Sequence, residues 1–486
     1  MNKLNLSKIF QEGLESFKKN QFDEAILKFN HILKVDPKSI NTLLILSQIY
    51  KKKGDLLNYE KLLNEINKLD PANYQVLNNL GGLYKKKRNL SLAENCFRKS
   101  IQINNNYDKA LFNLALLNEE KGKLSDATKY YLQAIDCDKN IPSYYFNLLR
   151  LDKSFIKKID FSFIKKLSEN TSSLDPKEKA YACFIMSIYA KQNKNIEEEI
   201  KYLDKGHSLF YSSDTKNKIS TNFWIDILPK VLKKKKVFKP LKKEKKNEKL
   251  KPIFVFGLPR SGTSLIETLI SSGNKKIYNA SETLVIPNSI FSSVIECEKK
   301  KNFELDLNDL SDKINLEYLK LFTQDNNNYI HFVDKTLENF FFTDLILELF
   351  PNSKLILCER NRFDNFVAIY QQCLTELPWT HNVNTILNYF NKYDEALKLN
   401  RTKSNKNILT IKLHDLTNDP VKYSKKIFSF CNLEWSEGVL EFYKRNDLFL
   451  NTASNIQLRQ KIFKTDKKKF ESYKPYFKKY FKDLDL

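Results

Sequence analysis

Apolar residues change their spacing along the chain, and this change divides it into two parts. After residue 252, short apolar runs alternate with stretches of helical spacing. Strands are predicted at 253–257, 330–334, 354–359 and 407–412, and helices at 263–273, 284–298, 339–350, 362–374, 384–400 and 420–431. This alternation is typical of a mainly parallel sheet with helices on both faces. Ligands of such sheets bind outside the carboxyl ends of the strands, so a site is expected there.

In the first 150 residues, small and aromatic residues recur with a period of 34. One turn position, repeated at this interval, holds Asp36, Asp70, Asn104 and Asp138. In the first helix of each expected pair the small residues are Gly13, Ser47, Gly81 and Ala115. In the second helix they are Ala25, Ala93 and Ala127. Aromatic residues beside them are Phe29, Tyr84, Phe97 and Tyr131. Small residues let paired helices approach, and each pair buries its remaining face on the next. The pattern resembles the tetratricopeptide repeat and predicts an α-solenoid over residues 1–150.

Two segments lie between the repeats and the strand–helix alternation that begins after residue 252. Residues 151–227 are predicted as a further helical, repeat-like segment, with a helix pair at about 179–212 and Ser187 as its small residue. Residues 228–251 are rich in lysine and poor in apolar residues, which predicts a linker with a basic face. The repeats themselves fit either a structural spacer or a concave surface for an extended peptide, and the sequence leaves both open.

Composition narrows the possible partners. The 486 residues include 82 Lys and Arg against 58 Asp and Glu, a net charge of +24. The basic segment lacks interleaved aromatic residues, so solvated lysines are preferred to a nucleic-acid or membrane patch. Seven scattered cysteines without a C-x-x-C pair suggest reduced thiols and a cytoplasmic location. No segment has the apolar length of a signal peptide or membrane span, and the five histidines are not spaced for metal binding.

The stretch that begins at Gly257 has the spacing of a phosphate-binding loop, G-x-x-x-x-G-K-[ST]. Both glycines and the final Ser264 fit, but Thr263 stands in the place of the lysine, and Arg260 lies inside the loop. The loop joins a predicted strand to a predicted helix, whose N-terminus favours an anion. The strand "KLILCE" is followed by Arg360, where a nucleoside triphosphatase would need an acid for Mg²⁺. A nucleotide kinase or triphosphatase is therefore disfavoured.

Two longer stretches, "PIFVFGLPRSGTSLIETLISS" and "VDKTLENFFFTDLILELFPNSKLILCERN", resemble the sulfotransferase superfamily. More narrowly, the chain resembles bacterial proteins with tetratricopeptide repeats ahead of a sulfotransferase domain, over about residues 5–486. Its catalytic part is similar to that of tyrosylprotein sulfotransferases. The predicted fold class is therefore α plus α/β: an α-solenoid of repeats, then a P-loop-type α/β sulfotransferase domain with a mainly parallel sheet over 252–486. The resemblance implies 3′-phosphoadenosine-5′-phosphosulfate (PAPS) as donor and no metal.

The resemblance also implies roles for single residues at the reacting centre. Those expected to bind the 5′-phosphosulfate are Arg260, Ser261, Gly262, Thr263 and Ser264. Glu282 in "NASET" would be the general base, with a surface carboxylate at a helix start as the alternative. Lys335 would neutralise the bridging oxygen of the leaving group, so Arg260, Glu282 and Lys335 form the predicted catalytic set. Leu337 excludes the histidine base of the cytosolic small-molecule branch.

The donor's 3′-phosphate site departs from the family pattern. Arg360 matches the family's arginine, but Ala368 and Gln372 replace the serine and the second arginine that follow it. Arg362 is the predicted compensation. Near the C-terminus "T-x-S-x-x-Q-x-R" places Ser454 and Arg459 as donor contacts, with Lys469 as a weaker one.

The leading hypothesis is a PAPS-dependent sulfotransferase. It would act on a hydroxyl of a peptide, at tyrosine, or of a carbohydrate presented by the repeats. The alternative is a repeat scaffold whose sulfotransferase domain has decayed and no longer catalyses, which Ala368 and Gln372 motivate.

Overall fold

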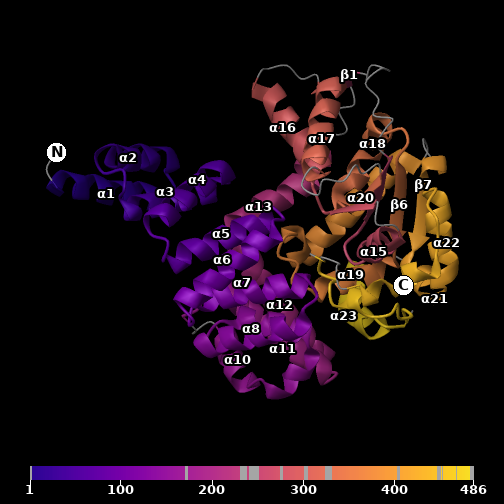
Figure 1. Cartoon of the computed structure of the whole chain (residues 1–486). Helices are drawn as coiled ribbons and strands as arrows, with labels where there is room; N and C mark the ends of the chain where they lie inside the picture. Colours follow the sequence, from indigo (N-terminus) through magenta and orange to yellow (C-terminus); the bar gives the residue numbers. More distant parts are fainter. Residues whose placement is uncertain are drawn as a thin grey trace. The chain divides into compact units, whose positions relative to one another are not determined.

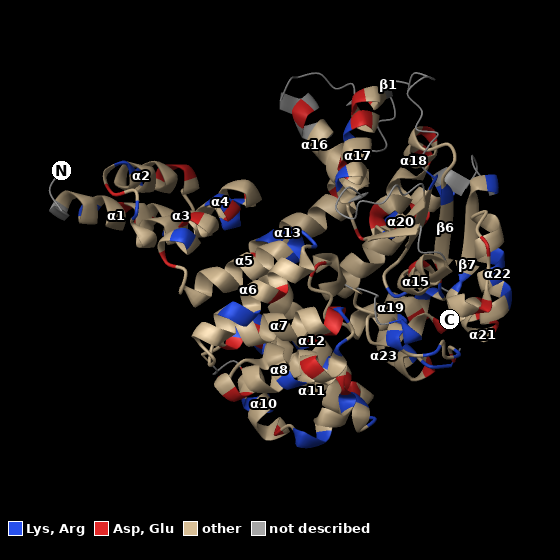
Figure 2. Ribbon diagram, in the orientation of Figure 1, with Lys and Arg blue, Asp and Glu red and all other residues tan. Residues whose placement is uncertain are grey.

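The computed structural model describes residues 3–169, 173–229, 238–239, 251–273, 277–299, 305–322, 331–401, 405–445, 450, 452–466 and 468–481. Its contacts divide the chain into two units, Met1–Lys157 and Lys158–Leu486 (Figure 1). Lys and Arg are spread over the elements of both units, with Asp and Glu between them (Figure 2). Most of the predicted linker, 230–237 and 240–250, lies outside the described residues.

The first unit is a series of antiparallel helix pairs, as the 34-residue period predicts. The helices are α1 (Lys3–Lys18), α2 (Phe22–Val35), α3 (Ile40–Lys53), α4 (Leu56–Leu69), α5 (Tyr74–Lys86), α6 (Leu90–Ile103), α7 (Asp108–Glu120), α8 (Leu124–Cys137) and α9 (Pro142–Leu151), before the 3₁₀ turn η1 (Lys153–Lys158). The small residues are needed where the helices cross. A Cβ atom on Gly13 would lie 2.8 Å from Phe29, and one on Gly81 would lie 2.5 Å from Phe97. The repeat prediction is confirmed down to these contacts.

The second unit begins with helices rather than with the sheet. These are α10 (Phe161–Ser168), α11 (Pro176–Gln192), α12 (Ile196–Ser212) and α13 (Thr215–Asn222), followed by the helical turn η2 (Phe223–Ile227). Helices α11 and α12 form the predicted pair, and a Cβ on Gly206 would lie 3.2 Å from Cys183. The predicted repeat-like segment thus groups, from residue 158 onward, with the α/β part of the chain.

Five parallel strands form the central sheet in the order β3-β5-β2-β6-β7. They are β2 (Lys251–Gly257), β3 (Ile277–Ser281), β5 (His331–Asp334), β6 (Lys354–Glu359) and β7 (Ile408–Lys412). Four of them were predicted from apolar runs. The edge strand β3 was missed because its sequence, IYNAS, is half polar. A separate two-stranded pair joins β1 (Phe238–Lys239) to β4 (Leu305–Asp306).

Helices connect the strands and flank the sheet. They are α15 (Thr263–Gly273), α16 (Val285–Lys299), α17 (Leu307–Phe322), α18 (Thr343–Leu349), α19 (Arg362–Tyr370), α20 (Val383–Arg401), α21 (Leu413–Asn418), α22 (Pro420–Phe430) and α23 (Lys474–Phe477). Short 3₁₀ turns are η6 (Leu337–Phe342), η7 (Pro378–His381), η8 (Asn405–Asn407), η9 (Glu437–Lys444), η10 (Gln457–Arg459), η11 (Glu471–Tyr473) and η12 (Lys478–Tyr480). The predicted helix at 339–350 is therefore η6 followed by α18.

Alternate residues of β2 show that both faces of the sheet are covered. Ile253 and Val255 pack with residues of α15 and α22 in one apolar cluster. Phe254, on the opposite face, contacts Phe332 and Phe350, and Tyr318 of α17 contacts the same two rings. The sheet is buried on both faces, as a parallel sheet requires. No helix in the described part of the chain is long and apolar enough to cross a membrane.

Candidate active site

The loop between β2 and α15 contains two positions, Gly257 and Gly262, where a side chain would collide with neighbouring atoms. A Cβ on Gly257 would lie 2.5 Å from the carbonyl oxygen of Cys358 on β6. Gly262 has φ +104°, and a Cβ there would lie 2.8 Å from Cδ1 of Leu413. Arg260 itself has φ +66°, an unusual conformation for a residue with a side chain. The loop is therefore held in one tight shape against β6 and α21.

This loop leaves polar groups that suit an anion. The first amides of α15, which begins at Thr263, have no carbonyl one turn earlier and carry the positive end of the helix dipole. The Ser261 hydroxyl and Arg260 Nε are both buried without a hydrogen-bond partner among the described residues. Buried polar atoms are rarely left without a partner, so these positions fit a ligand that brings its own oxygens.

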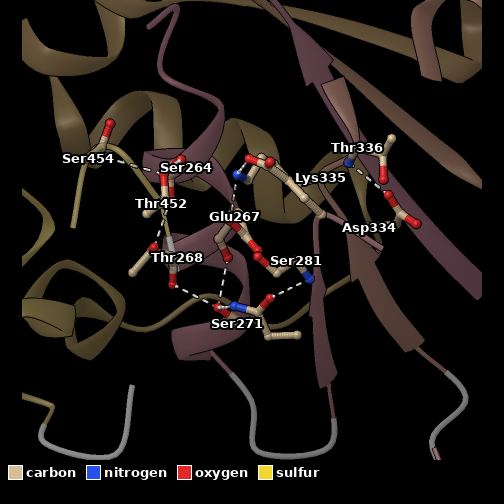
Figure 3. Close-up of polar contacts among 12 residues, drawn as sticks. Ser264, Glu267, Thr268, Ser271, Ser281, Asp334, Lys335, Thr336, Thr452 and Ser454 are labelled. Carbon is tan, nitrogen blue, oxygen red and sulfur yellow. Dashed lines mark hydrogen bonds and ion pairs between the residues drawn. The ribbon is translucent and has the colours of Figure 1, made fainter. Parts of the chain in front are cut away.

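A C-terminal segment contacts the loop. Arg260 donates through Nη1 to Ser454 and through Nη2 to Gln457, the latter at 3.0 Å. The hydroxyls of Ser264 and Thr452 are 2.9 Å apart (Figure 3). Of these C-terminal partners only Ser454 was assigned a role from sequence. Thr452 and Gln457 belong to the same T-x-S-x-x-Q-x-R segment, so the motif itself carried the signal.

Two arginines, Arg260 and Arg360, lie together beside the loop. Arg360, at the end of β6, donates to the carbonyl oxygen of Arg260 at 3.1 Å, and its guanidinium lies 5.4 Å from the centre of the Phe470 ring. Burial and the charge of Arg360 lower the pKa of Arg260 to about 10. Burial also lowers the pKa of Arg360, which Asp364 offsets in part. Within the described ranges neither arginine forms an ion pair, so the pair fits a ligand with several negative charges.

The remaining predicted donor contacts, Lys469, Arg459 and Arg362, have different neighbours. Lys469 Nζ lies 5.4 Å from the centre of the Phe470 ring, the same ring that Arg360 contacts. Arg459 Nε donates to Asn455 at 3.0 Å. Arg362 donates to Asp394 and, at 3.0 Å, to Asn391 of α20, and its role as a phosphate ligand stays a prediction.

The second feature of the site is a buried lysine among carboxylates, at the end of β5. Lys335 is 1% exposed and donates to Glu282, and its Nζ lies 3.9 Å from Oε2 of Glu267 on α15. Figure 3 shows the Lys335 side chain extending toward Glu267. Burial opposes the charge of Lys335, but Glu282, and after it Glu267, raise its pKa above the ordinary value. The structure thus brings Glu282 and Lys335 into direct contact.

Asp334, which the sequence did not single out, fixes the segments that carry these two residues. Its fully buried carboxylate accepts hydrogen bonds from Thr283 at 2.6 Å, Tyr318 at 2.7 Å, the Thr336 amide at 2.8 Å and Asn339 at 3.1 Å. Thr283 follows Glu282 in the chain, and Thr336 follows Lys335. One carboxylate therefore sets the distance between the candidate base and the candidate cation.

Glu338 is another buried carboxylate near this centre that sequence analysis missed. It is 4% exposed, and burial raises its pKa to about 7, with a smaller contribution from Glu282. Nothing in the sequence VDKTLENF shows that this glutamate turns inward, because the irregular η6 follows the strand. Among the described residues, no group of three or more His, Cys, Asp and Glu side chains is placed to hold a metal ion.

Comparisons with known proteins match the two halves of this description. Residues 252–437 match the sulfotransferase family, and residues 74–107 and 108–141 each match a tetratricopeptide repeat. The chain is 25% identical over 323 residues to an uncharacterized protein of Aquifex aeolicus (strain VF5). That match covers 63% of this chain but only 41% of the relative, so the chain spans well under half of the relative's length.

Solved structures give partial likenesses. One is pilF of Pseudomonas aeruginosa, at 17% identity and a TM-score of 0.34, covering 41% of this chain and 88% of that one. Another is PilW, described as a widely conserved type IV pilus biogenesis factor, at 17% identity and a TM-score of 0.35, covering 44% and 97%. Similarity to tyrosylprotein sulfotransferases stays a prediction. The match over residues 252–437, the parallel sheet and the loop after β2 agree: the chain carries a sulfotransferase-family domain behind tetratricopeptide repeats.

Proposed function

We propose that the protein transfers a sulfuryl group from PAPS to a hydroxyl group of a peptide tyrosine or a carbohydrate. The observation that carries this proposal is the placement of two different cationic sites at neighbouring strand ends. Arg260 and Arg360 follow β2 and β6, and Lys335 follows β5, and these strands are adjacent in the order β5-β2-β6. The arginines that suit an anion and the lysine–carboxylate centre therefore both lie at the carboxyl ends of the parallel strands.

The donor would be held by the loop after β2, where the Ser261 hydroxyl and Arg260 Nε are buried without a hydrogen-bond partner among the described residues, and by the cations beside it. The amides at the start of α15, the Ser261 hydroxyl and Arg260 suit the 5′-phosphosulfate, with Ser264 beside them. Arg360 suits the 3′-phosphate, with Ser454, Arg459 and Lys469 as the further proposed contacts. Holding both ends of the donor fixes its sulfur for in-line attack, which is the main contribution that positioning makes to such transfers.

The proposed step needs a base and a fixed positive charge. The acceptor oxygen bonds to sulfur while the bond from sulfur to the donor's phosphate oxygen breaks. The acceptor's proton passes to Glu282, and the electron pair of the broken bond stays on the phosphate oxygen, where Lys335 and the loop meet the charge. Removal of the proton is worth roughly 10²–10⁴ in rate. A fixed cation placed where charge develops stabilises the transition state more than the bound donor.

The repeats are proposed to select the acceptor. They form a unit of their own, Met1–Lys157, so they can be removed without cutting the helices that belong to the second unit. A chain beginning at residue 158 should bind the 3′,5′-bisphosphate product as the full chain does but transfer poorly to a macromolecular acceptor. Equal transfer by both chains would make the repeats a spacer.

The alternative is a scaffold whose sulfotransferase domain no longer catalyses. It is favoured by Ala368 and Gln372 in the place of donor-binding residues, and by Arg362, which pairs with Asp394. Calorimetry with 3′-phosphoadenosine-5′-phosphate and, separately, with ATP distinguishes the two functions. Binding of the bisphosphate alone supports the sulfotransferase. Absence of binding for both nucleotides would leave the scaffold, and preference for ATP would contradict both.

A further inference from the structure

The proposed base and the proposed catalytic cation contact each other directly, and this raises a mechanistic conflict. Glu282 must turn to the acceptor hydroxyl to take its proton, and its carboxylate is about half exposed, at 46%. Lys335 is 1% exposed, so it cannot exchange Glu282 for bulk water when that carboxylate leaves. A buried ammonium without a partner is costly and tends to lose its proton.

A second carboxylate is already in place for this lysine. Glu267 lies in the second turn of α15, the helix that begins directly after the phosphate loop, and it is 4% exposed. Its Oε2 is 3.9 Å from Lys335 Nζ, close enough for an ion pair. Its backbone is fixed by the helix, where its own carbonyl oxygen accepts from the Ser271 hydroxyl at 2.8 Å.

We propose that Glu267 is a positioning residue that keeps Lys335 charged and directed at the leaving oxygen when Glu282 turns to the acceptor. This inference rests on the proposed function. Lys335 then exchanges one carboxylate for another instead of losing its counter-charge. After Glu282 has accepted the acceptor's proton it is neutral, and the pair of Glu267 and Lys335 remains balanced while negative charge grows on the phosphate oxygen.

Other titratable groups around Lys335 do not replace Glu267. They are Asp334 on β5, Glu338 on η6 and Cys358 on β6, besides Glu282 itself. The Asp334 oxygens already accept four hydrogen bonds from other groups. Burial raises the pKa values of Glu338, to about 7, and of Cys358, so both resist carrying negative charge. Glu267 is the remaining carboxylate for which the structure shows an ion pair with Lys335.

The test is Glu267→Gln in the full chain, which keeps the side-chain shape and removes its charge. The alkaline limb of the pH profile of kcat should shift to lower pH by about one unit, because Lys335 gives up its proton more readily. Turnover at pH 7 should fall about tenfold, because Lys335 holds Glu282 more tightly, and the dissociation constant of 3′-phosphoadenosine-5′-phosphate should stay within twofold. An unchanged alkaline limb with unchanged turnover would overturn the proposal.

A matched control makes the same change at another buried, ion-paired glutamate. Glu119 of the repeats is 2% exposed and accepts from Arg150 at 2.7 Å. Glu119→Gln should leave the pH profile of kcat where it is. If Glu267→Gln does not fold, Glu267→Asp keeps the charge on a shorter stem, and it should lower turnover without moving the alkaline limb. A limb that moves in Glu267→Asp as well would show that charge is not the cause.

A second measurement does not depend on activity. The raised pKa of Lys335 contributes stability below its unfolded pKa, and this contribution is lost as the pH rises through the folded pKa. Above about pH 10.5 the thermal unfolding midpoint should therefore fall less steeply with rising pH in Glu267→Gln than in the unchanged chain, because less of this contribution is left to lose. Parallel curves would remove the coupling between Glu267 and Lys335. If the unchanged chain neither binds the bisphosphate nor transfers sulfate, the proposed function fails, but the unfolding curves still decide this coupling.

Discussion

The two cationic sites at the carboxyl ends of β5, β2 and β6 differ in how their buried positive charge is balanced. Arg260 and Arg360 lie together, burial and the charge of Arg360 lower the pKa of Arg260, and no described carboxylate forms an ion pair with either. Lys335 is more deeply buried and has two carboxylates, Glu282 and Glu267, within ion-pair distance. On the proposed function the difference gives the two sites two roles: the guanidinium pair would bind an anion in the ground state, whereas the neutralised lysine would meet charge that grows during the reaction.

The largest expected effect tests the lysine centre. Glu282→Gln should lower turnover roughly 10²–10⁴-fold, because the amide cannot take the acceptor's proton. The dissociation constant of 3′-phosphoadenosine-5′-phosphate should change less than twofold, since Glu282 faces Lys335 and not the arginine pocket. Steady-state transfer assays and calorimetry on the same preparation check both halves. Equal turnover in the variant and the unchanged chain would remove Glu282 from the mechanism.

A third buried basic site, a histidine pair between α12 and η7, stays neutral instead. His207 Nδ1 lies 2.9 Å from His381 Nδ1, and His207 Nε2 lies 2.8 Å from the carbonyl oxygen of Tyr370. Burial lowers the pKa of His207 to about 4 and that of His381 well below its ordinary value. Unlike Lys335, these rings have no carboxylate partner among the described residues.

This neutrality predicts a loss of stability in acid. Below about pH 6.5 His207 binds a proton in the unfolded chain but stays neutral in the folded chain, so the free energy of unfolding falls as the pH drops toward 4. The contribution of His207 is at most about 3 kcal/mol. Denaturant unfolding at pH 7 and pH 5 should show a smaller loss in His207→Gln than in the unchanged chain. His31, which is exposed, gives the control: His31→Gln should leave the pH dependence as it is.

Substituting the cations themselves sharpens the contrast. Arg360→Met should weaken binding of the bisphosphate by about 1.5–3 kcal/mol, the value of hydrogen bonds to a charged group. The same variant without ligand should unfold at a temperature no lower than that of the unchanged chain, because the cost of burying this charge, which Asp364 offsets only in part, has been removed. Lys335→Met should do the reverse, with nearly normal binding but a lower unfolding temperature, because it leaves Glu267 and Glu282 without their cation. Unfolding temperatures that fall equally in both variants would abolish the distinction between the two sites.

The sequence predicted the parts of these sites that depend on local pattern. The loop glycines, the arginine at the end of β6 and the lysine at the end of β5 follow from strand ends, and the Gly81–Phe97 contact follows from the repeat period. Glu267 could not be recognised, because in "LIETLI" it is one polar residue on a helix whose buried face only the fold reveals. Asp334 was missed for a similar reason: its partners come from three separate segments.

The association of α12 with the sulfotransferase part was also beyond prediction, because it depends on contacts between residues far apart in the chain. Glu199 of α12 is 2% exposed and accepts from Gln371 at 2.9 Å and from the Tyr473 hydroxyl at 2.6 Å. The repeat-like pattern around Glu199 correctly predicted a helix but could not show what the helix packs against. Lys191 adds a longer contact to the same carboxylate, at 3.7 Å.

The smallest expected effect tests whether this helix supports the arginine pocket from outside. Tyr473 lies next to Phe470, with ring centres 6.0 Å apart, and Phe470 contacts Arg360. Tyr473→Phe removes one hydrogen bond to buried Glu199, so the free energy of unfolding should fall by about 1–2 kcal/mol. Binding of the bisphosphate should weaken several-fold, because the segment that carries Phe470 loses its anchor, while the pH profile of kcat keeps its position, because Lys335 is untouched. The matched control is Tyr476→Phe in the same segment, where the side chain is exposed and the same hydroxyl is removed. Loss of stability without any change in binding would confine Glu199 to the fold and leave the arginine pocket dependent on the sheet alone.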